Sequence, residues 1–165
     1  MTGLAGLNDR TIAAVKDPAN THPILVAKIS DDEAEQLLLA LQSAGVRIYV
    51  MDGRQMRSEE GFFEQLSSAL GWNNMGRNWN AVLDQLRDIP SLPSNRGSLA
   101  IFRWADQVLQ DWPERIDILI NVFQQAAKER AVDVGSTEPT PFHLLLMTDN
   151  VTSTVGRWGS SATVV

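Results

Sequence analysis

The chain has 165 residues, a length typical of one folded domain or of one domain with an extension. Of these residues 44% are hydrophobic and 21% charged, which is ordinary for a globular protein. Its 14 Lys and Arg are outnumbered by 20 Asp and Glu, and because a nucleic-acid surface needs clustered basic side chains, direct binding of nucleic acid is disfavoured. The chain has no cysteine, which excludes disulfides and thiolate-bound metals.

The first 45 residues predict an irregular lead-in followed by a strand and a helix. Turn-forming residues are frequent over 1–22, so we expect an irregular or weakly ordered lead-in there. Residues 24–29 are apolar enough for a short strand. Ser30 and Glu33 have the spacing of a capping box, which starts a helix. We therefore expect residues 1–45 to be an N-terminal extension that adds a strand and a helix.

Residues 46–150 alternate strand and helix patterns. Short apolar runs predict strands at 46–51, 99–104 and 142–147. Helical spacing and helix-start signals predict helices at 58–70, 79–88 and 105–110, and one that begins at Pro113. Gly, Ser and Thr are frequent after residue 150, so we expect residues 151–165 to be a mobile C-terminal tail.

Connections of helical length separate nearly all the predicted strands. Such connections indicate a parallel sheet, because parallel neighbours cannot be joined by a hairpin. The predicted fold class is α/β, with a small parallel sheet of three to four strands and helices packed on it.

No apolar run approaches the length that spans a bilayer. Residues 1–10 also lack the basic stretch and apolar core of a secretory signal. We therefore expect a cytoplasmic protein that does not contact a membrane.

The segment 73–89 joins a polar loop to a predicted helix. In a helix that begins near Trp79, one face is apolar and points inward through Trp79, Val82, Leu83 and Leu86. Asn80, Asp84 and Asp88 follow at intervals of four on another, polar face. The asparagines of the loop lie at the leading end of this helix. Loop and polar face together predict a convex ridge, a shape suited to entering a cleft.

This part of the sequence resembles the barstar (barnase inhibitor) family. The family pattern is a strand that ends in a glycine turn, a helix, and then Gly-x-Asn-x-x-Ala-x-x-Asp-x-Leu. Here the strand runs into Met51-Asp52-Gly53, and the later pattern is met by Gly76, Asn78, Ala81, Asp84 and Leu86. An aromatic-ended strand, a Phe-bearing helix and a final apolar strand follow in the family's order. The resemblance covers roughly residues 46–150, which we treat as a barstar-like domain.

The resemblance implies a non-catalytic protein that binds a secreted guanyl-specific ribonuclease and blocks its active site with the loop and helix near residues 73–89. Asp84 matches the family's central acid, which occupies the phosphate site of the nuclease. The other contact positions that the resemblance implies are Asn74, Asn78, Asn80, Leu83, Asp88, Ile89 and Gln125. We add Asn73 and Gly76 from the same loop.

Four of these positions depart from the best-known member of the family. Asn80 and Gln125 stand where that member has acids, and Asn74 and Leu83 where it has aromatic side chains. Of its three key acids, Asp84 alone is kept. These departures leave the scaffold intact and weaken the case for barnase itself as the target.

Two other functions stay open: an immunity or adaptor protein that binds a different toxin or partner, and an enzyme or ligand-binding α/β domain. The sequence has no Walker loop, dinucleotide fingerprint or Gly-x-Ser-x-Gly elbow, which disfavours an enzyme. His143 lies in an apolar strand, so we expect a packed side chain there. We expect no cofactor and no metal, a ribonuclease as protein partner, and a monomer in the bacterial cytoplasm when free.

Overall fold

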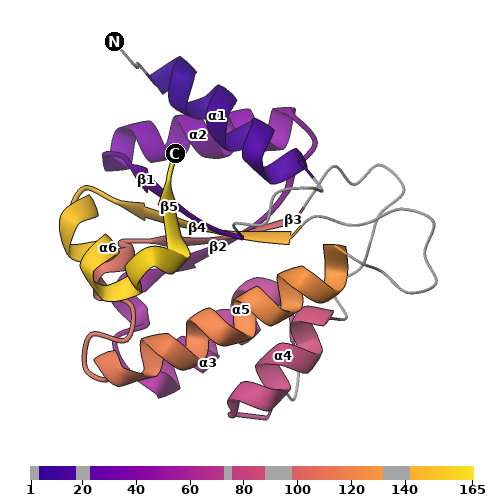
Figure 1. The fold of residues 1–165 in the computed structure, drawn as a ribbon, viewed down its shortest axis with the longest axis vertical. Coiled ribbons are helices and arrows are strands. Elements are labelled where there is room, and N and C mark those ends of the chain that lie inside the picture. The colour runs from indigo at the N-terminus through magenta and orange to yellow at the C-terminus, as the bar shows by residue number, and fades with distance from the viewer. Residues whose placement is uncertain (1–3, 18–22, 73–75, 88–97, 132–141) are drawn as a thin grey trace.

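The computed structural model describes residues 4–17, 23–72, 76–87, 98–131 and 142–165. These residues form one parallel sheet of five strands between two layers of helices (Figure 1). The strands are β1 (Ile24–Lys28), β2 (Arg47–Asp52), β3 (Ser98–Arg103), β4 (Phe142–Thr148) and β5 (Ala162–Val164). Their order across the sheet is β2-β3-β4-β1-β5. The predicted α/β class and parallel sheet are confirmed, with one strand more than the largest number expected.

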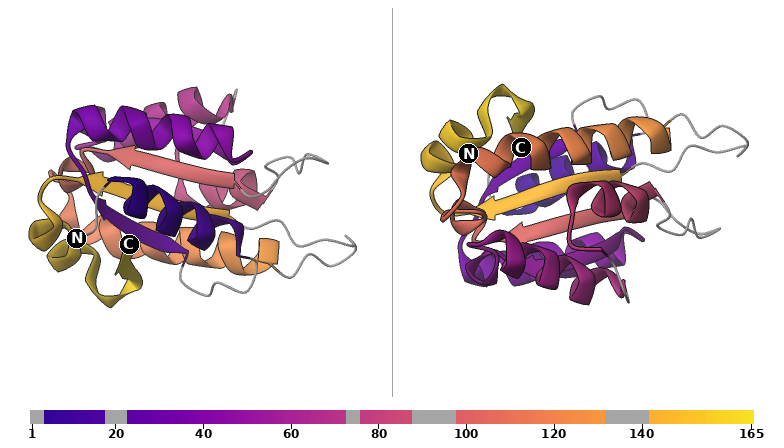
Figure 2. Two further views of the ribbon diagram at one scale, coloured as in Figure 1. Left: turned by 90° about the horizontal axis from the view of Figure 1, so that it is seen from above. Right: turned by 90° about the horizontal axis from the view of Figure 1, so that it is seen from below.

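The described residues also contain six α-helices and four short 3₁₀ turns. The α-helices are α1 (Leu4–Lys16), α2 (Asp31–Ser43), α3 (Glu59–Leu70), α4 (Trp79–Arg87), α5 (Ile116–Ala131) and α6 (Val151–Trp158). The 3₁₀ turns are η1 (Gly53–Gln55), η2 (Ala105–Gln107), η3 (Pro113–Arg115) and η4 (Gly159–Ser161). The helix predicted over 105–110 is therefore only a single 3₁₀ turn. The views from above and below show helices lying across both faces of the sheet (Figure 2).

The strands alternate between two hydrophobic cores because successive side chains of a strand point to opposite faces. Leu25, Leu99 and Leu145 lie in the core under α1 and α2. Their neighbours Ile24 and Ala100 lie in the core under α3, α4, α5 and α6. The central strands are buried on both faces, which explains why they read as continuous apolar runs.

The predicted start of α2 is confirmed atom by atom. Ser30 Oγ accepts a hydrogen bond from the backbone N–H of Glu33, and the Glu33 carboxylate accepts one from the backbone N–H of Ser30, both at 3.3 Å. This capping box directs the chain from the end of β1 onto the face that α1 also covers. β1 pairs with β4, so the N-terminal strand enlarges the same sheet.

The expectation of an irregular N-terminus is wrong for residues 4–16, which form α1. Leu7, Thr11 and Val15 follow one another at intervals of four and are buried against the rest of the protein. The hydroxyl of Thr11 donates to the Leu7 carbonyl at 2.8 Å, so this polar residue is buried without an unsatisfied donor. The sequence shows this stripe only weakly because glycines and polar residues surround it.

The expectation of a mobile tail at 151–165 is also wrong. Asn150 Oδ1 accepts from the backbone N–H of Ser153 at 3.1 Å and thereby caps α6. Trp158 at the end of α6 is fully buried, and β5 then pairs with β1. One sheet thus takes strands from 1–45, 46–150 and 151–165, and the division of the chain at these boundaries stays a proposal.

Candidate protein-binding surface

The start of α4 is fixed by an asparagine cap. Asn78 Oδ1 accepts a hydrogen bond from the backbone N–H of Ala81 at 2.8 Å, and the Asn78 carbonyl accepts one from Val82 N at 3.2 Å. A Cβ at Gly76 would lie 3.0 Å from Asn78 Nδ2, so a side chain there would press on the cap. Gly76 and Asn78 are both exposed, which leaves the cap accessible at the surface.

The inward face of α4 is the one that its spacing predicts. Val82 and Leu86 are fully buried, while Trp79 and Leu83 are partly buried against the same core. The Trp79 ring lies 5.0 Å from the ring of Phe62 and 5.3 Å from that of Phe63, measured between centroids. These contacts hold α4 on α3.

A hydrogen bond adds direction to this packing. Trp79 Nε1 donates to a carboxylate oxygen of Glu59 at 2.9 Å, so the indole has one apolar and one polar anchor on α3. Trp79 therefore positions α4, in agreement with its place on the inward stripe.

The outward face of α4 carries Asn80 and Asp84, one helical turn apart and both exposed. The side chain of Asp84 is 70% exposed. Asp84 Oδ1 accepts a hydrogen bond from Arg87 Nη1 at 3.0 Å within the same helix. The face predicted to be polar is therefore polar and accessible, and it carries an acid next to a base.

Arg87 connects this face to α5. Its Nη2 donates to Glu129 Oε1 at 3.0 Å, and its Nε donates to the other carboxylate oxygen of Glu129. Gln125 Nε2 donates to Glu129 Oε1 at 3.2 Å. The hydrogen bonds from Arg87 hold the pKa of Glu129 below its ordinary value. Asp84 and Gln125, two predicted site residues from different helices, thus belong to one hydrogen-bonded surface.

Sequence reasoning missed Arg87 and Glu129. The spacing from Asp84 to Arg87 and from Gln125 to Glu129 allows a contact within each helix, and this signal was available. The contact between the helices depends on how α4 packs on α5, which no local pattern gives. The best-known family member has an acid at the position of Gln125. In this protein the nearby acid is Glu129, one helical turn further along α5.

Six of the ten predicted site residues belong to the described part of the chain: Gly76, Asn78, Asn80, Leu83, Asp84 and Gln125. Asn73, Asn74, Asp88 and Ile89 lie outside the described residues. Leu83 is half-buried and packs toward the core, so it offers less surface than the polar residues around it. We call the exposed group Asn78, Asn80, Asp84, Arg87, Gln125 and Glu129 the α4–α5 surface.

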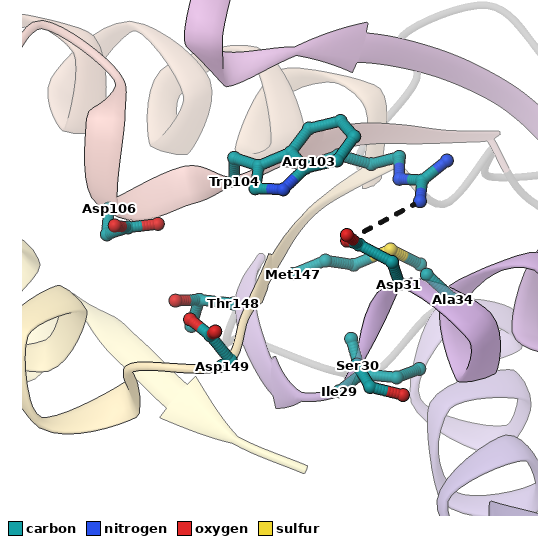
Figure 3. A pocket seen from close by; sticks show the side chains of 10 residues that line it. All are labelled: Ile29, Ser30, Asp31, Ala34, Arg103, Trp104, Asp106, Met147, Thr148 and Asp149. Atoms are coloured by element: carbon teal, nitrogen blue, oxygen red, sulfur yellow. Dashed lines mark ion pairs between the residues drawn. The ribbon is translucent and has the colours of Figure 1, made fainter.

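A separate cavity of about 280 Å³ lies at the carboxyl ends of β1, β3 and β4 (Figure 3). It is lined by Ile29, Ser30, Asp31, Ala34, Arg103, Trp104, Asp106, Met147, Thr148 and Asp149. In open α/β sheets this is the edge where ligands bind, at the point where the connections leave toward opposite faces. Here α2 follows β1 on one face and α6 follows the neighbouring β4 on the other.

The basic side chain that lines this cavity pairs with two carboxylates of α2. Arg103 Nη1 donates to a carboxylate oxygen of Glu35 at 2.6 Å, and Arg103 Nη2 lies 3.8 Å from Asp31 Oδ1. Trp104 has a left-handed backbone with φ of 48°, an uncommon conformation for a bulky residue. None of these residues was predicted as a site, because strand ends distant in sequence bring them together.

Over the described residues, no three His, Asp or Glu side chains gather as metal ligands would. Within the same part of the chain, no helix has both the length and the apolar character needed to cross a membrane.

The fold and the α4–α5 surface define a small α/β protein that presents one exposed polar helix on a packed scaffold. The family model described as Barstar (barnase inhibitor) matches residues 46–146, more than half of the chain. The chain therefore belongs to the barstar family. This confirms the resemblance, and the match includes both α4 and α5. A comparison with curated proteins finds no match.

Proposed function

We propose that this protein is a non-catalytic inhibitor of a secreted microbial ribonuclease of the guanyl-specific type. The loop and helix near residues 73–89 would block the active site of that ribonuclease. The observation that carries the proposal is the family match over 46–146 together with the exposure of Asp84 on the helix that matches the family's binding helix. The proposed partner is thus a protein, with no nucleic acid or membrane involved.

The chemistry of inhibition follows from the position of Asp84. A ribonuclease active site holds basic groups that bind the substrate phosphate, and a carboxylate that enters the site can accept charge-assisted hydrogen bonds from them. In the free protein Asp84 is bonded to Arg87, but ion pairs between exposed side chains of one helix are weak. The exposed carboxylate of Asp84 can therefore accept hydrogen bonds from cations of the target in addition to the one from Arg87.

The residues around Asp84 are suited to hydrogen bonding more than to electrostatic attraction. Asn78 is a neutral amide that caps α4, Asn80 is a neutral amide on α4, and Gln125 is a neutral amide on α5. Neutral groups add little to long-range steering of the two proteins. We therefore propose association that is less sensitive to salt than that of a strongly acidic relative.

The inhibitor role fits a monomer that protects the producing bacterial cell from its own ribonuclease before export. Under this proposal the protein acts in the cytoplasm and has no catalytic activity of its own. The support for this is family membership and the absence of catalytic motifs from the sequence.

Two alternatives each have an observation in their favour. The neutral residues at positions 80 and 125 favour an immunity or adaptor protein whose target is not a ribonuclease. The cavity at the carboxyl edge of the sheet favours a ligand-binding role. α5 begins at that edge of the sheet and leads away from it. Asp84 lies near the last turns of α5, so it and the cavity occupy different ends of the protein.

A panel of ribonucleases separates these possibilities. The activity of several secreted guanyl-specific enzymes is titrated with the protein, with a pancreatic-type ribonuclease as the negative control. We expect at least one guanyl-specific enzyme to lose its activity at a 1:1 ratio, and a mononucleotide that fills its active site to compete with the inhibitor. Full activity of every guanyl-specific enzyme at tenfold molar excess of the protein would contradict the proposal.

A further inference from the structure

Arg87 is a positive charge within a surface that is proposed to enter a cationic active site. Its guanidinium group is held by two carboxylates, Asp84 on its own helix and Glu129 on α5. Nothing in the family pattern requires a base at this position. We therefore infer what Arg87 does to the choice of partner from its contacts in the structure.

The two carboxylates do not hold Arg87 equally. Glu129 accepts from both Nε and Nη2 and so uses one whole edge of the guanidinium group, whereas Asp84 accepts from Nη1 alone. Paired hydrogen bonds from the guanidinium fork are the stronger and more specific arrangement. Gln125 donates to Glu129 from the same helix and helps to fix the carboxylate. Arg87 is thus anchored to α5, and Asp84 is the partner that can be exchanged.

The side chain of Arg87 is 38% exposed and that of Asp84 is 70% exposed. A cation of the target that reaches Asp84 therefore also approaches the Arg87 guanidinium group, whose Nη1 lies 3.0 Å from Oδ1 of the same carboxylate. Arg87 cannot turn away without giving up its hydrogen bonds to Glu129. Like charges brought together where water is excluded weaken a complex, and such repulsion is a common source of partner selection.

We propose that Arg87 is a specificity-determining residue, a fixed positive charge beside Asp84 that disfavours ribonucleases with strongly cationic active sites. This inference rests on the proposed inhibitor function and refines its partner class. The favoured target is a ribonuclease whose active site offers few cations to Asp84 and tolerates the guanidinium group next to it. The trio of Asp84, Arg87 and Glu129 carries a net charge of −1, and removal of Arg87 doubles its negative charge.

The test compares Arg87→Gln with Arg10→Gln, which removes the same charge from α1 on the opposite face of the sheet. Association and dissociation rates are measured with barnase and with each enzyme that the panel identifies, at low and high salt. We expect Arg87→Gln to bind barnase about fivefold more tightly at low salt, mostly through faster association, and to lose most of this gain at high salt. Arg10→Gln should change the affinity less than twofold.

A conservative variant separates charge from hydrogen-bond geometry. Arg87→Lys keeps the charge and loses the fork to Glu129, so it should gain less affinity for barnase than Arg87→Gln does. If the wild type binds barnase and Arg87→Gln binds barnase equally or more weakly, Arg87 does not select against cationic sites and this inference is overturned, while the inhibitor function stands. If neither protein binds any ribonuclease, both the inference and the proposed function fail.

Discussion

Replacement of Asp84 by alanine should separate binding from folding. The Asp84 side chain is 70% exposed on the outer face of α4, and its hydrogen bond with Arg87 lies at the surface. Exposed substitutions of this kind change the free energy of unfolding by about 0.5 kcal/mol or less, and alanine is a good helix former. For a chain of this size, the melting temperature should therefore shift by no more than about 2 °C.

The effect on binding should be much larger. In the proposed complex Asp84 pairs with a basic group of the ribonuclease away from water, and its removal leaves that group dehydrated and without a counter-charge. Loss of one member of such a pair costs about 2–5 kcal/mol, a range that rests in part on the barnase–barstar complex of this same family. The dissociation constant should then rise by a factor of roughly 30 to several thousand.

The assay is competitive titration of an inhibited ribonuclease, with thermal unfolding measured on the same samples. Asp9→Ala is the matched control, because Asp9 is an exposed acid within α1 on the other face of the sheet. The control should bind like the wild type. Equal losses of affinity in both variants, or none in either, would refute the role given to Asp84.

Three further predictions concern the scaffold. Burial lowers the pKa of His143 to about 4, whereas an unfolded histidine titrates near 6.5, so the unfolded chain takes up a proton that the folded chain does not. The free energy of unfolding should therefore be highest above about pH 6.5 and fall by up to about 3 kcal/mol as the pH drops toward 4. Urea unfolding at pH 7.5 and pH 5 measures this fall, which should be smaller for His143→Leu than for the wild type. Equal falls in the two proteins would contradict the prediction. Deletion of residues 1–45 removes β1 from between β4 and β5. The truncated protein should therefore have a lower melting temperature and form aggregates in gel filtration. An unchanged melting temperature and a monodisperse profile would show that the extension is independent. A Cβ at Gly53 would lie 2.4 Å from the Trp104 carbonyl oxygen, so Gly53→Ala should destabilise the fold by about 1–3 kcal/mol in urea unfolding, while Gly156→Ala, whose Cβ meets nothing within 4 Å, should not.

Most of the sheet could be predicted from the sequence because its signals are local. Apolar runs of strand length mark β2, β3 and β4, and the capping box of Ser30 and Glu33 marks the start of α2. α1 and β5 were missed for a physical reason. The burial of α1 rests on a narrow stripe of three residues, and β5 is short and is specified by its pairing with β1. Tertiary contacts thus define these elements more than propensity does.

The same distinction applies to the candidate site. Helical periodicity from Trp79 assigned the inward and outward faces of α4, including the exposure of Asp84. Periodicity could not show that Arg87 reaches Glu129, because that contact depends on the packing of α4 against α5. The cavity was invisible for a related reason, since its walls come from three strand ends that only the completed sheet brings together.

Hydrogen exchange tests the central claim most directly. Backbone exchange is measured for the protein alone and in a 1:1 mixture with a ribonuclease that it inhibits. The account predicts slower exchange in the mixture for α4 and for the last turns of α5, with no change at residues 29–34 and 103–106 around the cavity. Slower exchange around the cavity, with none along α4, would contradict it.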